Sequence, residues 1–101
     1  MAKTELFTVT DDVVVPEEGV NTFEILDFDT PTGCVIEPDR SDDRLRLLRK
    51  NFGDSAWTSV TDDKGDIVLS SRRKEVVISM PGVYALAGRV TGTLLAYTIT
   101  V

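Results

Sequence analysis

Carboxylates are the commonest groups in this chain that could do chemistry: its 101 residues include 17 acids, no histidine and one cysteine. Asp27-Phe28-Asp29 places two acids on one face of an extended chain, and Asp39, Asp42 and Asp43 form a second acidic cluster. Either group could contribute to a Ca²⁺ site, which takes about six to eight oxygen ligands, but neither matches an EF-hand loop. Acids in loops are usually just solvated, so the sequence predicts no metal and no cofactor.

Nucleophilic catalysis has little support in the residue types. Cys34 has no histidine to act as its base, and its neighbours Val35 and Ile36 indicate a buried thiol that behaves as a small hydrophobe. No Gly-x-Ser-x-Gly motif, phosphate-binding glycine loop or zinc ligand set is present. A glycosidase pair of carboxylates depends on three-dimensional spacing and stays open. Because so short a chain rarely holds both a core and a substrate cleft, we expect a protein that is not an enzyme.

Two basic clusters are the better candidates for binding. Arg44, Arg46, Arg49 and Lys50 form the first, and Arg72-Arg73-Lys74 forms the second. They predict contact with an acidic partner, with a solvated face or a charged edge strand as the alternative. Trp57, the sole tryptophan, is either a core residue or an interface anchor. The interface candidates are Arg44, Arg46, Arg49, Lys50, Arg72, Arg73 and Trp57.

The charge is unevenly distributed along the chain. Residues 1–43 contain twelve acids and two bases, a charge of −10, whereas residues 44–101 contain five acids and nine bases, a charge of +4. The net charge of −6 argues against direct nucleic-acid binding, which favours a basic face. With this uneven charge, the acidic half could bind a basic neighbour or a second copy of the chain. Alternatively, the two halves interleave in the fold and the asymmetry disappears.

The elements that must position these residues are short β-strands. Runs rich in Val, Thr, Ile, Phe and Tyr alternate with Gly, Pro, Asp and Asn clusters, which is typical of an all-β protein. Strands are expected near 5–10, 12–15, 20–28, 33–37, 56–61, 66–70, 75–80, 83–90 and 93–101. That many strands in one domain spanning 1–101 predicts a two-layer antiparallel β-sandwich or a jelly roll. Asp62-Asp63-Lys64-Gly65 predicts a hairpin turn with Gly65 in a left-handed conformation.

The segment 42–52 is ambiguous. Ser41 could cap a short helix that Asp42 and Asp43 begin and that Gly53 ends. Arg44-Leu45-Arg46-Leu47 alternates as a strand does, and its neighbours are all β, so we favour the strand.

The last strand alternates with period two, so one of its faces should be buried. Leu95, Tyr97, Ile99 and Val101 share the more apolar face, and we expect that face to lie in the core. The predicted core is Phe7, Val9, Phe23, Ile25, Val35, Trp57, Val60, Ile67, Leu69, Val77, Tyr84, Leu86, Leu95, Tyr97 and Ile99.

Residues 57–101 carry a family resemblance. Ala56-Trp57-Thr58-Ser59-Val60 is followed by a polar Asp-Gly turn, and Val76-Val77-Ile78-Ser79-Met80 leads into Pro81-Gly82-Val83-Tyr84 and one last alternating strand. This pattern resembles the C-terminal half of small β-sandwich proteins of tailed bacteriophage virions. The resemblance implies a structural protein that sits on a capsid or tail, as a decoration, cement or tail-associated component. Its partners would be capsid or tail proteins, and it would often be a trimer.

The expected location follows from the same resemblance and from the hydropathy of the chain. No apolar run approaches the roughly 18 residues of a spanning helix, and no apolar signal core follows Met1–Lys3. We therefore expect no membrane association, no secretion by a signal peptide, and assembly into a virion in the host cytoplasm.

Two other functions fit the sequence. A small acidic inhibitor or regulator could use the −10 half to cover a basic site on a host protein. A carbohydrate-binding or adhesive β-module could use Trp57, Tyr84 or Tyr97 as a sugar platform.

Overall fold

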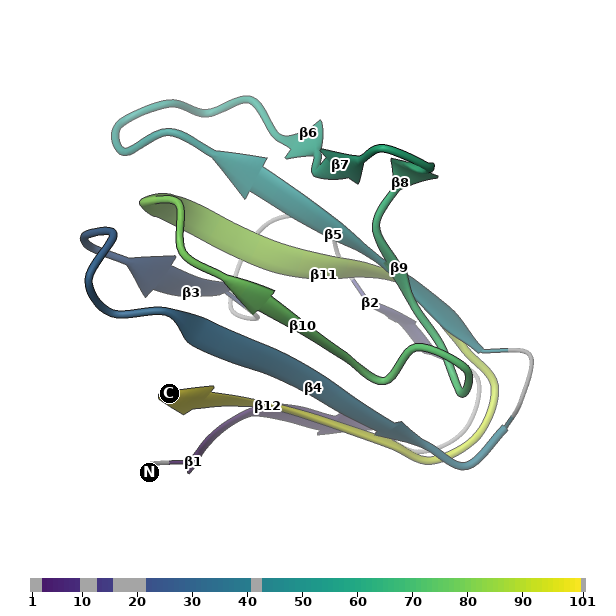
Figure 1. Cartoon of the computed structure of the whole chain (residues 1–101). Helices are drawn as coiled ribbons and strands as arrows, with labels where there is room; N and C mark the ends of the chain where they lie inside the picture. Colours follow the sequence, from purple (N-terminus) through teal and green to yellow (C-terminus); the bar gives the residue numbers. More distant parts are fainter. Residues whose placement is uncertain (1–2, 10–12, 16–21, 41–42, 101) are drawn as a thin grey trace.

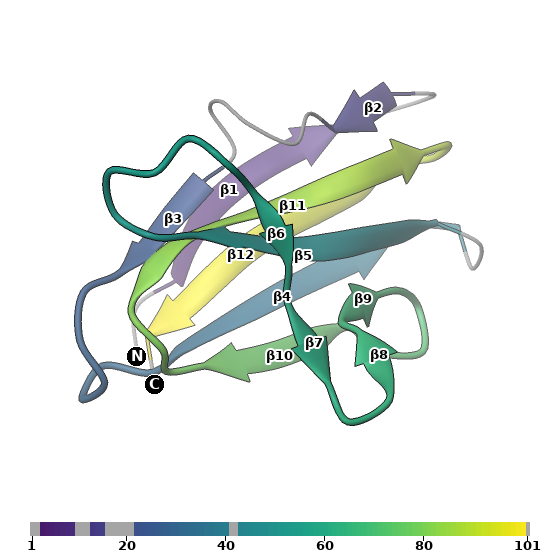
Figure 2. The ribbon, with the colours of Figure 1, turned by 90° about the horizontal axis from the view of Figure 1, so that it is seen from above.

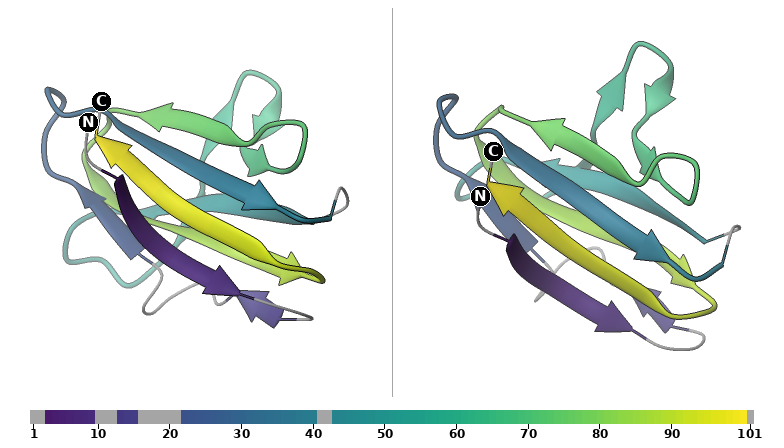
Figure 3. Two further views of the ribbon diagram at one scale, coloured as in Figure 1. Left: turned by 90° about the horizontal axis from the view of Figure 1, so that it is seen from below. Right: turned by 60° about the horizontal axis from the view of Figure 1, so that its bottom comes forward.

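Two antiparallel sheets packed face to face make up the protein in the computed structural model, which describes residues 3–9, 13–15, 22–40 and 43–100 (Figure 1). The smaller sheet has the order β1-β12-β4-β10, and its strands lie side by side in Figure 3. These strands are β1 (Lys3–Val9), β12 (Leu94–Thr100), β4 (Thr32–Pro38) and β10 (Glu75–Ile78). The described residues contain no helix, so the prediction of a mainly-β sandwich is confirmed.

The larger sheet is built around two long strands, β5 (Arg44–Lys50) and β11 (Gly82–Val90), which pair over seven residues. The strands that flank them are β2 (Val13–Val15), β3 (Thr22–Ile25), β6 (Thr58–Ser59) and β9 (Val68–Leu69). A separate hairpin of β7 (Thr61–Asp62) and β8 (Gly65–Asp66) projects beside β9 and β10 (Figure 2). Its turn matches the prediction, because Gly65 has a φ of 115° and the Lys64 amide donates to Asp62 Oδ1 at 2.9 Å.

The two halves of the chain interleave. β12, from the basic half, lies between β1 and β4 of the acidic half, and β4 in turn pairs with β10. The charge difference between the two halves of the sequence therefore does not divide the folded molecule into an acidic and a basic lobe.

The ambiguous segment 42–52 contains a strand. Leu45 and Leu47 are fully buried, whereas Arg44 and Arg46 are exposed, as the period of two requires. Ser41 and Asp42, the proposed start of the alternative helix, lie outside the described residues. Asp43 is buried, and its Oδ1 accepts hydrogen bonds from the Thr91 amide and hydroxyl at 3.0 and 2.7 Å. Asp43 therefore fixes the start of β5 to the turn between β11 and β12.

The face of β12 that enters the core is opposite to the prediction. Leu94, Ala96 and Thr98 are buried, whereas Leu95, Tyr97 and Ile99 are half-buried on the outer face of the smaller sheet. The alternation was correct, but a period of two does not say which side is inside. The outer residues are partly covered by neighbours, and the Lys3 ammonium lies 4.1 Å from the centre of the Tyr97 ring. Val101 lies outside the described residues.

Most of the remaining predicted core is confirmed. Phe7, Ile25, Val35, Ile67, Leu69, Tyr84 and Leu86 are buried, and Phe23 and Val60 pack against the core. Val77 is 61% exposed and Trp57 is half-buried outside the core cluster, so the prediction was wrong for both. The side chain of Val9 lies outside the description. Cys34 is buried as expected, and its burial raises the pKa of the thiol to about 12.

Candidate functional site

Three arginines gather on the outer face of the larger sheet. Arg44 and Arg46 are exposed on β5, and the register places Arg89 of β11 directly opposite Arg44. We call Arg44, Arg46 and Arg89 the arginine row. Arg44 and Arg46 were predicted from the sequence, whereas Arg89 was not, because its place beside them depends on the pairing of β5 with β11.

The arginine row suits an acidic ligand on electrostatic grounds. The register places Arg44 directly opposite Arg89, and two like charges so placed on a sheet repel each other. A carboxylate placed over these arginines would be attracted to both, and the planar guanidinium group can bind a carboxylate through two parallel hydrogen bonds. Arg46 also donates to Ser59 Oγ at 3.5 Å, which ties it to β6.

Arg49, Lys50 and Trp57 are engaged within the molecule. The half-buried Arg49 donates from Nη1 to Asn51 Oδ1 at 2.9 Å and from Nη2 to the Pro81 carbonyl. The Lys50 ammonium lies 5.0 Å from the centre of the Trp57 ring, so it covers one face of the indole. Arg49 therefore connects loops within the protein. Lys50 covers part of the Trp57 ring, so less of that ring is accessible to a sugar.

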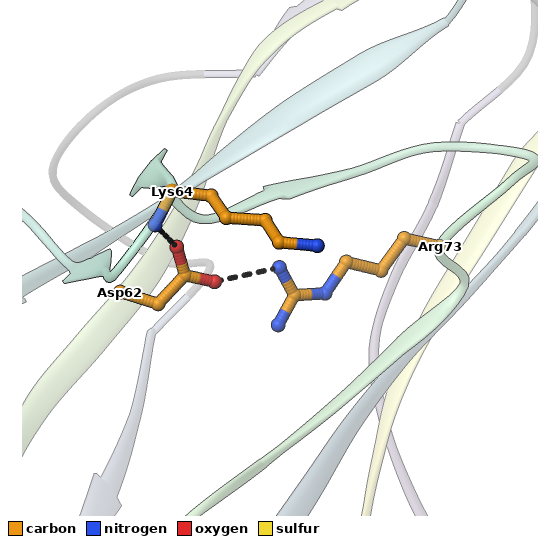
Figure 4. A network of polar contacts seen from close by, with 3 residues as sticks. All are labelled: Asp62, Lys64 and Arg73. Atoms are coloured by element: carbon orange, nitrogen blue, oxygen red, sulfur yellow. Dashed lines mark hydrogen bonds and ion pairs between the residues drawn. The ribbon is translucent and has the colours of Figure 1, made fainter.

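Arg72 and Arg73 lie on the connection between β9 and β10, apart from β5. Arg73 Nη1 is 3.1 Å from Asp62 Oδ2, which ties this connection to the β7–β8 hairpin (Figure 4). The pKa of Asp62 is lowered, first by the Lys64 backbone amide that it accepts and then by the Arg73 guanidinium. The structure therefore gives Arg73 a partner within the protein.

The lowered pKa of Asp62 predicts a pH dependence for the hairpin. The Asp62 contacts stabilise its folded position above the ordinary aspartate pKa of 3.8 and are lost as pH falls through the lower, folded-state pKa. We expect an NMR titration that follows the chemical shift of the Asp62 carboxyl carbon to give a pKa below 3.8. Arg73→Gln should raise that midpoint only in part, because the Lys64 amide still binds the carboxylate. A midpoint at or above 3.8 in the native protein would contradict this assignment.

A groove of about 710 Å³ runs beside the outer face of the smaller sheet. Val35 and Tyr97 contribute to its lining, together with Glu37, Arg72 and Lys74. Hydrogen bonding to Glu37 raises the pKa of the Tyr97 hydroxyl, and partial burial adds to the shift. The groove presents both signs of charge, so its chemistry does not select one class of ligand.

The acidic clusters do not assemble into a ligand set within the described part of the chain. Asp27 Oδ1 accepts the Asp29 amide at 2.9 Å and the Thr30 hydroxyl at 3.0 Å, so this carboxylate closes a turn. Asp43 points to Thr91, and Asp42 lies outside the description. Residues 3–9, 13–15, 22–40 and 43–100 contain no group of three side chains that could hold a metal ion.

In the same described residues, no helix meets the length and hydropathy needed to cross a bilayer.

Comparison with known protein-family models, with curated proteins and with solved structures found no match to this chain.

Proposed function

We propose that the protein is a non-enzymatic structural component of a tailed-bacteriophage virion, which attaches to a capsid or tail protein through the arginine row. The observation that carries this proposal is the exposed cluster of Arg44, Arg46 and Arg89 on one sheet face. The resemblance of residues 57–101 supports the virion as the setting, with assembly in the host cytoplasm as a homo-oligomer, a trimer.

A structural attachment role needs a rigid face with complementary charge more than it needs reactive groups. The arginine row lies on β5 and β11, the two longest strands of the larger sheet, so its guanidinium groups start from a fixed backbone. Charge complementarity on such a face fixes the register of a subunit on a repeated lattice. An acidic surface on the capsid or tail is the matching partner.

Charge reversal of the row is the direct test. In the double variant Arg44→Glu/Arg46→Glu we expect the melting temperature to stay close to that of the native protein, because exposed substitutions change stability by about 0.5 kcal/mol or less. We expect its copy number on purified particles to fall by roughly tenfold or more, since each broken charge-assisted contact is worth about 1.5–3 kcal/mol. Quantitative mass spectrometry of particles from the phage that encodes the chain measures this.

Lys64→Glu/Lys74→Glu is the matched control, because it changes the net charge by the same amount on exposed residues outside the arginine row. It should leave particle binding unchanged. Light scattering after gel filtration should show the mass of a trimer for the native protein and for both variants. Equal copy numbers for the native and charge-reversed proteins would reject the arginine row as the attachment site, and absence of the native chain from particles would reject the virion role.

A further inference from the structure

Four large apolar side chains are exposed in loops at one end of the sandwich. Leu26 is 72%, Phe28 66%, Phe52 49% and Met80 52% exposed. They belong to three loops, 26–31, 51–57 and 79–81, which lie at the left of Figure 1. The register brings these loops together, because Ile25 pairs with Gly82, Lys50 with Val83 and Thr32 with Ile78. We call these three loops the loop end.

The first loop holds Phe28 in a turn that its own side chains close. Asp27 Oδ1 accepts both the Asp29 amide and the Thr30 hydroxyl, so the backbone on either side of Phe28 is fixed. Turns of this kind form locally and need no contact with the rest of the fold. Phe28 therefore projects from an ordered loop.

The second loop presents Phe52 in the same manner. The Asp54 amide donates to the Asn51 carbonyl at 3.1 Å, and Asn51 Nδ2 donates to Asp54 Oδ2 at 3.1 Å. Gly53, with a φ of 84°, supplies the left-handed residue that the turn requires. Phe52 thus stands at the tip of a turn closed by backbone and side-chain hydrogen bonds.

The third loop is joined to the second through Arg49. The Tyr84 hydroxyl donates to the Met80 carbonyl at 2.6 Å, while Arg49 donates to the Pro81 carbonyl and to Asn51 Oδ1. One guanidinium therefore fixes two loops of the loop end relative to each other. Burial raises the pKa of Tyr84 above the ordinary tyrosine value of 10.0, which already leaves the hydroxyl protonated at neutral pH, so it can donate there.

From this arrangement we propose that the loop end is a preorganised docking surface for a partner protein segment that combines large apolar side chains with Lys or Arg. Clustered exposed apolar residues on a soluble domain mark binding surfaces, and anchors that are already ordered lose less entropy on binding. The three loops contain the acids Asp27, Asp29 and Asp54 and no base. The adjacent bases Arg49 and Lys50 are half-buried and contact Asn51, Pro81 and Trp57 within the protein. This charge distribution favours basic side chains on the partner and disfavours an anionic membrane. The loop end is separate from the arginine row, so this proposal can be tested independently of the proposed virion role.

A displayed library of random 12-residue peptides is the probe for this chemistry. Peptides selected on the immobilised native protein are then titrated against Phe28→Ser/Phe52→Ser and against Val77→Ser. Val77 is the matched control, since it is 61% exposed on β10, on the outer face of the smaller sheet. Melting curves check that each variant is folded. If the double variant is not, Leu26→Ser and Phe28→Ser replace it as single changes.

We expect selected peptides to combine large apolar residues with Lys or Arg. Their affinity should fall at least tenfold in the Phe28/Phe52 variant, stay unchanged in Val77→Ser, and weaken with added salt. The proposal would be overturned if the selected peptides bound the Phe28/Phe52 variant as tightly as the native protein, or if the selection yielded no binder. Binding to phosphatidylcholine or phosphatidylserine vesicles that is lost in the double variant would also overturn it, because the ligand of the loop end would then be a membrane. Self-association of the native protein that is lost in the double variant would overturn it too, because the loop end would then bind a second copy of the chain.

Discussion

Replacing Leu94 with alanine is expected to lower the free energy of unfolding by about 3 kcal/mol, within the usual range for a leucine truncated in a core. Leu94 is fully buried and belongs to the core cluster between the two sheets. Truncation removes its apolar transfer energy and leaves a cavity that the surrounding strands fill only in part. Since a domain of this size is stabilised by about 5–15 kcal/mol in total, the loss is a large fraction. Urea unfolding followed by Trp57 fluorescence measures it.

Leu95→Ala is the matched control, because it is the same substitution one residue further along the same strand. Leu95 is only half-buried on the outer face, so its truncation should cost about 1 kcal/mol and leave no enclosed cavity. The difference between the two variants tests which face of β12 enters the core. Equal losses, or a larger loss at Leu95, would show that the inward face has been assigned wrongly.

Gly88→Ala is expected to destabilise the protein by about 3 kcal/mol, at the upper end for overpacking. A Cβ added at Gly88 would lie 2.3 Å from the Arg44 carbonyl oxygen and 3.0 Å from Leu45 Cδ2. The first neighbour is backbone, so β5 and β11 would have to separate where they pair. That separation also shifts the backbone of Arg44, and the arginine row should lose affinity for its partner.

Gly33→Ala separates this close approach from the general effect of adding a methyl group in a strand. Gly33 is buried in β4, and the nearest atom to its added Cβ is the Ile99 carbonyl oxygen at 3.7 Å, an ordinary contact. We expect a change within about 0.5 kcal/mol, because the added methyl group meets no clash and alanine restricts the unfolded chain more than glycine does. Chemical denaturation of both variants gives the comparison, and a loss at Gly33 as large as that at Gly88 would refute the steric account.

Local alternation predicted much of the fold. Arg44-Leu45-Arg46-Leu47 forms a strand because alternate leucines enter the core, and the Asp62–Gly65 turn forms because its residues suit a tight hairpin. The inward face of β12 could not be predicted from the same rule, since both faces carry residues that can be buried. Leu94 and Ala96 face the core because the larger sheet packs on their side of β12, where they join Leu45, Leu47 and Leu86 in one cluster.

The candidate site was predicted in part. Arg44 and Arg46 were identified from their spacing, but Arg89 joins them only through the pairing of β5 with β11. The loop end was missed because residues 20–28 were expected to form one strand, whereas β3 ends at Ile25. Asp27 was considered as a cation ligand, but the structure uses its carboxylate to close the turn that presents Phe28. Exposure of an aromatic residue depends on tertiary packing, which composition does not reveal.

The central position of β12 has a consequence for the order in which the chain folds. Lys3 pairs with Ile99, and at a synthesis rate of about 5–20 residues per second the two are made about 5–20 s apart. During that interval β1 has no partner and β4 lacks one of its neighbours, because the strand between them does not yet exist. The smaller sheet therefore closes late, through long-range contacts that make folding slow. A nascent chain of this protein carries open strand edges that a chaperone or a premature partner could bind.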